Sequence, residues 1–434
     1  MGRSAAIVDV VVVGAGAAGL AAAKTAREEG LSVALLEAKG RIGGRAFTET
    51  HSFGVPFDHG CHWLHSASIN PLAELADAYG FTYARDSLEE SLRVHMGDRW
   101  ATEAEREEQV AFRERNDAAI QAAARAGRDI PIIEVTERDA RWTSVFDCWF
   151  AVLSSVDPEE GSTLDYASYK STGEDWPVKE GYGALIARYG ADVAVELDTP
   201  VERIDWRGRA IEVATPKGVI TTRAVITTVS TGVLSSGRIR FDPPLPDWKR
   251  SAIEALPIGK VNKIAFQFDR DVFGSLETGS MAVFAPTSES VVFEIRPFGR
   301  ALAVGHVGGR FCAALEEAGP AAMVDFALER LKTMFGAGIA RRLVKTACTA
   351  WGGDPYIRGG YSAARPGHAH RRADLAAPID DRLFFAGEAA SIDSYATAHG
   401  AYLTGIAAAA AAAAARSPKG LKKRRLYTTI QGET

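Results

Sequence analysis

The sequence has little of what marks a disulfide-rich, metal-binding or nucleic-acid-binding protein. Its 434 residues include only 4 cysteines, scattered along the chain without a C-x-x-C pair. This spacing argues against a disulfide framework and a structural zinc site, and it fits a reducing compartment. The formal net charge of −5 argues against a nucleic-acid-binding protein. We therefore expect a soluble protein of two or three domains, located in the cytoplasm and without a metal site.

Long hydrophobic runs are also scarce. The apolar stretch that begins at Ile7 continues into glycines rather than into a cleavage site, which predicts a strand and not a signal peptide. The alanine-rich stretch near the C-terminus is interrupted by Thr404 and Gly405. It therefore falls short of the roughly 18 apolar residues that a membrane span needs. The basic segment 417–434 is typical of a solvated tail.

The first 40 or so residues contain a dinucleotide-binding pattern. Val8–Val13 is a nearly continuous β-branched run, as expected of a strand covered on both faces. Gly14, Gly16 and Gly19 follow as G-x-G-x-x-G, then an alanine-rich helix and a second apolar strand that ends at Glu37. The glycines permit a tight turn and close approach to a pyrophosphate, and the carboxylate at the second strand end can accept hydrogen bonds from a ribose.

The segment after Glu37 favours FAD over NAD. It reads AKGRIGGR, in which Gly43 and Gly44 allow backbone to pass close to a ligand. Arg41 and Arg45 can neutralise phosphate. NAD enzymes do not need this second element, whereas the longer FAD can use it.

Together with four later segments, this N-terminal region resembles the flavin-containing amine oxidase superfamily, in particular its polyamine oxidase and flavin histone demethylase branch. The later segments are FDHGCHWLHSASINP, LPIGKVNKIAFQFDR, AWGGDPYIRGGYSAARPG and YATAHGAY. The resemblance implies an α/β fold with a Rossmann-like FAD-binding domain (1–85, 178–259 and 371–416). That domain is interleaved with a substrate-binding domain of mixed sheet plus helices (86–177 and 260–370), and the basic tail 417–434 follows.

The resemblance also implies where FAD binds. Gly60 to Trp63 is expected to lie against the flavin, Val201 against the adenine, and Glu388 beside the ribityl hydroxyls. Gly360 stands where mammalian monoamine oxidases carry the cysteine that bonds to flavin, so we expect non-covalent FAD. The full set of expected FAD contacts is Gly14, Gly16, Ala17, Ala18, Gly19, Glu37, Ala38, Arg41, Gly44, Arg45, Gly60, Cys61, His62, Trp63, Val201, Gly387, Glu388, Thr397 and Ala398.

Three residues are expected to act at the reacting end of the site. Strand alternation leaves Lys263 on the face opposite Ile264, free to point into a cavity. The resemblance gives this lysine the role of holding a water against the reactive ring nitrogen of the flavin. Tyr361 and Tyr402 match the two aromatic residues that flank the amine.

Three further residues are expected to bind substrate. His65 matches a histidine of the polyamine oxidase branch, and Trp351 matches a neighbour of the flavin. Asp157 falls, by spacing alone, where plant polyamine oxidases carry a glutamate for a distal amine. For His65 a packed loop histidine, and for Asp157 an Asp-Pro turn, remain as alternatives.

The expected activity is FAD-dependent oxidation of a primary amine, diamine or polyamine. Hydride leaves the carbon next to nitrogen, the imine hydrolyses to an aldehyde, and oxygen becomes hydrogen peroxide. Amino-acid oxidases of this family carry an arginine where Trp63 stands, which argues against a substrate carboxylate. A flavin dehydrogenase or desaturase with a quinone acceptor, an L-amino-acid oxidase and a catalytically silent FAD scaffold remain as alternatives.

Overall fold

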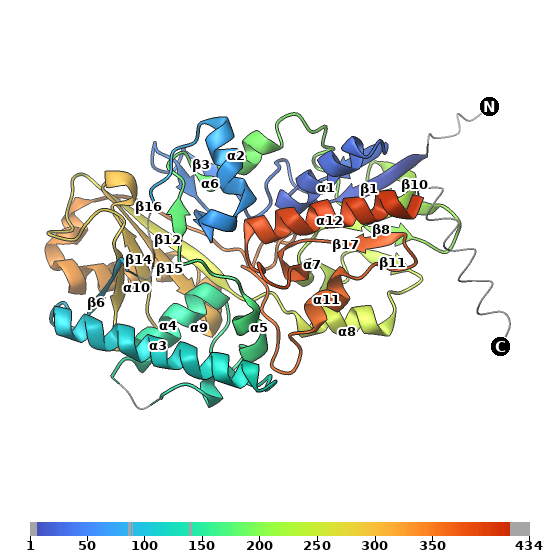
Figure 1. Ribbon diagram of the computed structural model, residues 1–434. Coiled ribbons are helices and arrows are strands. Elements are labelled where there is room, and N and C mark those ends of the chain that lie inside the picture. The colour runs from blue at the N-terminus through green and yellow to red at the C-terminus, as the bar shows by residue number, and fades with distance from the viewer. Residues whose placement is uncertain (1–6, 86–87, 89, 139–140, 417–434) are drawn as a thin grey trace.

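The computed structural model describes residues 7–85, 88, 90–138 and 141–416. Two sheets lie at opposite ends of the molecule, with helices packed around each (Figure 1). The first sheet has the order β11-β8-β9-β10-β1-β2, with β17 beside β10. Its strands are β1 (Val8–Val13), β2 (Val33–Leu36), β8 (Arg203–Asp205), β9 (Ile211–Thr215), β10 (Gly218–Thr227), β11 (Arg240–Asp242) and β17 (Leu383–Phe385).

The first sheet is buried on both faces at its centre. β1 pairs in parallel with β2 and β10, and β17 pairs in parallel with β10. Val10 and Val12 pack into a core shared with α1 (Ala17–Glu28), whereas Val11 and Val13 pack into a separate core on the other face. The β-branched run at the N-terminus is therefore a central parallel strand, as its composition predicts.

The second sheet is mixed. Its order is β16-β12-β15-β14-β13-β6, and β13 pairs in parallel with β6 while the other neighbours are antiparallel. Its strands are β6 (Leu92–His95), β12 (Val261–Phe268), β13 (Met281–Phe284), β14 (Val292–Ile295), β15 (Leu302–Gly308) and β16 (Leu343–Cys348). Two small antiparallel pairs complete the strands: β3 (Thr48–Glu49) with β4 (Phe57–Asp58), and β5 (Trp63–His65) with β7 (Asp175–Pro177).

Helices cover both sheets. The remaining α-helices are α2 (Pro71–Tyr79), α3 (Glu103–Arg125), α4 (Thr143–Ser154), α5 (Thr163–Ser168), α6 (Tyr182–Tyr189), α7 (Thr231–Ser235), α8 (Asp247–Ala255), α9 (Gly309–Ala318), α10 (Pro320–Phe335), α11 (Arg371–Ala376) and α12 (Ala398–Arg416). Short 3-10 turns span Ala67–Ile69, Ile132–Glu134, Pro297–Gly299, Ala337–Arg342 and Glu388–Ala390.

This architecture confirms the predicted fold class, an α/β protein with a mixed second sheet. The strands of the first sheet fall within the segments assigned to FAD binding, and those of the second within the segments assigned to substrate binding. The predicted basic tail lies outside the described residues.

The alanine-rich helix α12 lies along α1 (Figure 1). Gly405 faces α1 so closely that a Cβ there would sit 2.1 Å from the carbonyl oxygen of Ala18. By length and composition α12 is the one described helix that could cross a membrane. Its small residues instead pack against α1, which is typical of a core helix.

Gly405→Ala tests this close contact. Helix propensity alone favours alanine over glycine by roughly 1 kcal/mol. The clash with the Ala18 carbonyl costs about 1–3 kcal/mol and forces the helices apart, so we expect a net loss in the free energy of unfolding. Denaturant titration measures it, with Ala410→Leu on the exposed side of α12 as a control that changes little. A more stable Gly405→Ala variant would contradict the packing.

Candidate active site

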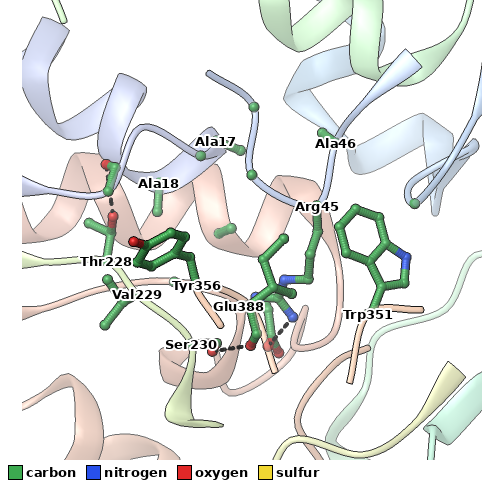
Figure 2. Close-up of a pocket in the computed structure, with 18 of the residues that line it drawn as sticks. Ala17, Ala18, Arg45, Ala46, Thr228, Val229, Ser230, Trp351, Tyr356 and Glu388 are labelled. Carbon is green, nitrogen blue, oxygen red and sulfur yellow. Dashed lines mark hydrogen bonds and ion pairs between the residues drawn. The ribbon is translucent and has the colours of Figure 1, made fainter. Parts of the chain in front are cut away.

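A cavity of about 440 Å³ runs between the two sheets. One half of its wall comes from the glycine turn, the ends of β2, β10 and β17, and the start of α12. The other half comes from the loop before β5 and from the second sheet. Figure 2 shows the stretch of wall where Arg45 and Glu388 meet, with Ala17 and Ala18 on one side and Trp351 on the other.

The glycine turn leaves an open cradle at the start of α1. Gly14 has φ +99°, and a Cβ there would lie 2.8 Å from Thr228 Oγ1. A Cβ on Gly16 would meet nothing closer than 3.9 Å, so its backbone faces open space. No side chain caps α1, and its N–H groups are available to a phosphate. Gly19 lies behind this turn, since its Cβ would sit 1.8 Å from the Gly14 carbonyl oxygen.

Glu37 lies at the end of β2 on the cavity wall. Its carboxylate accepts hydrogen bonds from the backbone N–H of Ala15 at 2.7 Å and of Lys39 at 2.9 Å. Burial raises the pKa of this carboxyl group, although both hydrogen bonds oppose the shift. The two bonds fix a buried acceptor where a ribose of a dinucleotide would need one.

Arg45 and Glu388 form an ion pair on the wall, with Nη1 and Oε1 2.9 Å apart (Figure 2). Glu388 also accepts hydrogen bonds from the Ser362 hydroxyl at 2.7 Å and from the Ala396 backbone N–H at 3.1 Å. Burial works against ionisation of this carboxyl, yet Arg45 and Ser362 lower its pKa. Arg41 does not reach the wall; it donates to the carbonyl oxygens of residues 42 and 44 and supports the loop from behind.

The helix α12 begins at the cavity. The Thr397 hydroxyl donates to the Ser394 carbonyl at 2.6 Å and accepts from the Gly400 N–H at 3.0 Å, which caps the helix. Most of the residues predicted to contact FAD line the cavity: Gly14, Gly16, Ala17, Ala18, Glu37, Ala38, Gly44, Arg45, Gly60, Cys61, His62, Trp63, Val201, Gly387, Glu388, Thr397 and Ala398. Open glycine backbone and two helix N-termini facing one cavity fit a dinucleotide cofactor such as FAD. Gly19 and Arg41 support this wall instead of lining it.

Gly360 leaves no room for a side chain. A Cβ there would sit 2.3 Å from Val261 Cγ1. The backbone carbonyl of Gly360 accepts a hydrogen bond from Arg45. This position therefore cannot carry a residue that bonds to the cofactor without moving β12.

Lys263 and His306 line the cavity from one face of the second sheet, which we call the floor. Strand pairing places Lys263 on β12 opposite His306 on β15. Glu294 on β14 lies on the same sheet face, opposite Val304. The Lys263 ammonium donates to the Asp58 backbone carbonyl at 2.9 Å. Burial lowers the pKa of Lys263, although the nearby carboxylates of Asp58 and Glu294 oppose the shift.

His62 is held between two carboxylates above this floor. Nδ1 lies 2.8 Å from Asp58 Oδ2, and Nε2 lies 3.3 Å from Glu294 Oε1. Burial would lower the pKa of His62, but the two carboxylates outweigh it and raise the pKa to about 9. By contrast, burial and the cations of Lys263 and His62 lower the pKa of His306 far below its usual value. Within the described residues, His306 Nε2 is buried without a hydrogen-bond partner.

Sequence reasoning missed Asp58, Glu294 and His306. Of these, His306 lines the cavity, whereas Asp58 and Glu294 hold His62 and do not line it. The signal for Glu294 and His306 is one charged or titratable residue in an otherwise apolar strand, as in VFEI and LAVGHVG. Asp58 carries no such signal, because it lies in a two-residue strand.

Aromatic side chains form the remaining wall. Trp63 lies with its ring centroid 5.2 Å from that of His306, and Trp351 donates from Nε1 to the His59 carbonyl at 3.1 Å. The Tyr361 hydroxyl donates to the Val152 carbonyl, and burial raises the pKa of this phenol. Trp63, Trp351, Tyr361 and His65 all line the cavity.

Two expected substrate-site residues lie elsewhere. Tyr402 is one position beyond the wall residue Ala401, a turn of about 100° around the helix, and its ring packs 5.5 Å from that of Tyr189. Asp157 accepts hydrogen bonds from Arg310, with Oδ2 2.6 Å from Nε, beside a separate small pocket. Neither residue lines the cavity, so the structure does not bring them together with the other expected site residues.

Comparison with known proteins agrees with this geometry. The family model described as flavin containing amine oxidoreductase matches residues 17–413. Polyamine oxidase 5 of Oryza sativa subsp. japonica is 32% identical over 94% of this chain and 88% of its own length. A structure of putrescine oxidase bound to putrescine has a TM-score of 0.76 at 22% identity, covering 93% of this chain and 98% of that chain. Cyclohexylamine oxidase from Brevibacterium oxydans IH-35A has a TM-score of 0.77 at 21% identity, covering 94% and 99%.

The His62 site predicts a pH-dependent stability. The pKa of His62 is about 9 in the folded state, against an ordinary value of 6.5. Its stabilisation is therefore complete below pH 6.5 and is lost as the pH rises through 9, amounting to roughly 3 kcal/mol. Denaturant titrations from pH 6 to pH 10 should show that loss in the wild type. In His62→Gln the deficit should be largest at pH 6 and smaller at pH 10.

His51→Gln is the matched control for this measurement, because the His51 side chain is 78% exposed. We expect its stability to follow the wild type at each pH. Equal pH dependence in the wild type and in His62→Gln would show that His62 is not the titrating group.

Proposed function

The chain belongs to the flavin-containing amine oxidoreductase family, and we propose that its substrates are primary amines with an apolar or aromatic substituent. FAD-dependent amine oxidation is the activity of this enzyme. FAD, when bound, accepts the hydride that leaves the carbon next to the amine nitrogen. The observation that carries the proposal is the aromatic wall around the floor: Trp63, Trp351 and Tyr361.

This wall favours an uncharged substituent. Among the described residues, the carboxylates on the wall are Glu37, Glu202 and Glu388. Glu37 and Glu388 belong to the dinucleotide half, and Glu202 is exposed just before β8. A second ammonium group at the aromatic end would lack a direct carboxylate partner, and burying it unpaired is costly. With Asp157 paired to Arg310 outside the cavity, the expected contact to a distal amine is absent there.

The same wall offers no partner for the carboxylate of an amino-acid substrate. Trp63 provides no cation for a substrate carboxylate, and both ring nitrogens of His62 are occupied by protein carboxylates. Lys263 is buried and donates to the Asp58 carbonyl. L-amino acids are therefore poor substrates in this proposal.

We further propose that oxygen is the electron acceptor, that hydrogen peroxide is released, and that the enzyme works in the cytoplasm. Two structural relatives, putrescine oxidase and cyclohexylamine oxidase, are oxidases by name, which supports the oxidase reaction. The four free cysteines support a reducing compartment.

The cofactor should be non-covalent. Gly360 has no side chain, and a Cβ there would meet Val261. We expect acid precipitation of the yellow protein to leave all the flavin in the supernatant, where chromatography against authentic FAD identifies it. Yellow colour that stays in the pellet would place a covalent bond at another residue.

An amine panel tests the substrate class. We expect anaerobic flavin reduction to be at least tenfold faster with cyclohexylamine and benzylamine than with putrescine and spermidine, and undetectable with L-leucine and L-phenylalanine. Peroxide release in air should follow the same order. Fastest reduction by spermidine would refute the apolar substituent but keep amine oxidation, whereas fast reduction by an L-amino acid would overturn the argument from Trp63.

A further inference from the structure

One histidine on the cavity wall is paired with a carboxylate through a single ring nitrogen. His65, at the end of β5, lies opposite Asp175, at the start of β7, in the two-stranded sheet. His65 Nδ1 is 2.6 Å from Asp175 Oδ1. A carboxylate at this distance fixes the proton on Nδ1, so Nε2 carries the lone pair. Within the described residues Nε2 has no hydrogen-bond partner, and the side chain is 32% exposed.

The other histidines on the wall lack this arrangement. His62 has a carboxylate on each nitrogen, so neither is free. His306 has no carboxylate partner, and it faces the cations of Lys263 and His62. His59 also has one carboxylate, but the contact from its Nε2 to Glu49 is longer, 3.4 Å, and burial lowers the pKa of His59. Among these four, His65 has the shortest contact to a single carboxylate, together with an open second nitrogen.

We propose that His65 Nε2 accepts a proton from the substrate ammonium group and that Asp175 is the positioning residue that makes it able to do so. This rests on the proposed function, because amines enter mostly protonated at neutral pH and only the neutral amine can lose a hydride. In the step, one N–H bond of the ammonium breaks and the Nε2–H bond forms. The electron pair stays on the substrate nitrogen, and no oxidation takes place. The partly exposed imidazolium then returns the proton to water.

The surroundings of His65 suit this role. Asp175 faces it from β7 and balances the imidazolium charge. His399 faces it from α12, and burial followed by the proximity of His65 lowers the pKa of His399 to about 4, so it stays neutral. Asn70 fixes both, since its amide nitrogen donates to the His65 carbonyl at 3.0 Å and lies 3.3 Å from His399 Nδ1. Tyr169 lies near Asp175, and burial raises the pKa of Tyr169 to about 12, which keeps it neutral too.

The test is the pH dependence of anaerobic flavin reduction by cyclohexylamine in the wild type, His65→Gln and Asp175→Asn. At pH 7 we expect His65→Gln to be slower by about 100-fold, the lower end of the usual contribution of a general base. At a pH above roughly 10.4, the value for an alkyl ammonium, the amine enters neutral and the variant should recover to within about threefold of the wild type. Asp175→Asn should fall between the two at pH 7. Glu174→Gln, the neighbouring carboxylate, is the matched control and should stay within twofold at each pH.

NMR of imidazole-labelled enzyme gives a readout that does not depend on turnover. We expect the His65 signal to report the Nδ1–H form in the wild type, and this preference to be lost in Asp175→Asn. A deficit of His65→Gln that is equal at every pH would overturn the proposal, because it would indicate a structural role. A defect of Asp175→Asn confined to putrescine and spermidine would also overturn it, because the pair would then hold a distal ammonium. If no amine reduces the flavin in the wild type, the proposed function fails, and a His65 signal protonated on Nε2 would separately refute the dyad.

Discussion

The ion pair between Arg45 and Glu388 joins side chains that are 343 positions apart in the sequence, and the cavity is built around it. The pair continues through the Ser362 hydroxyl to Arg372, and from Arg372 to Asp165 on α5 at 2.8 Å. Positive and negative groups alternate along this buried chain. Removing one member would leave a neighbouring charge buried and unpaired, which is far more costly than losing a surface ion pair. The chain therefore ties the glycine-arginine loop, the end of β17 and the helical substrate segment into one arrangement.

The two halves of the cavity are built by different means. In the dinucleotide half, the wall is formed mainly by backbone, namely open glycines and helix N-termini, together with the fixed carboxylate of Glu37. In the substrate half, the wall is formed by side chains on a sheet face and on short strands, and the small Ala265 leaves room beside Lys263. Backbone features tolerate few substitutions, whereas single side chains on a sheet face change without disturbing the fold. This difference explains why one fold, shared with putrescine and cyclohexylamine oxidases, is compatible with different substrate preferences.

The same division explains what the sequence predicts well. Gly14, Gly16 and Glu37 were predictable because strand, turn and helix lie in one continuous segment, and local spacing fixes their geometry. Tyr402 and Asp157 were expected on the wall from spacing to a family pattern, but their directions depend on the rotation of α12 and on Arg310, which comes from a distant helix. The two residues of the pair His62–Glu294 are 232 positions apart, and those of His65–Asp175 are 110 apart, so no local sequence pattern predicts either pair. Conversely, the lysine at 263 was found because alternation along a single strand is a local property.

Three histidines on one wall show how the fold separates charge states at a single pH. His62 has two carboxylates and is a fixed cation; His306 faces two cations and is fixed in the neutral form. Neither His62 nor His306 therefore changes its charge near neutral pH, whereas an effective acid–base group titrates near the working pH. His65 has one carboxylate, one open nitrogen and contact with solvent, so it is the member of the three that can exchange a proton with a bound amine and with water. The buried charges of the floor thus set the field in which the cofactor and the amine meet, while proton transfer is left to the rim of the cavity, where water can carry the proton away.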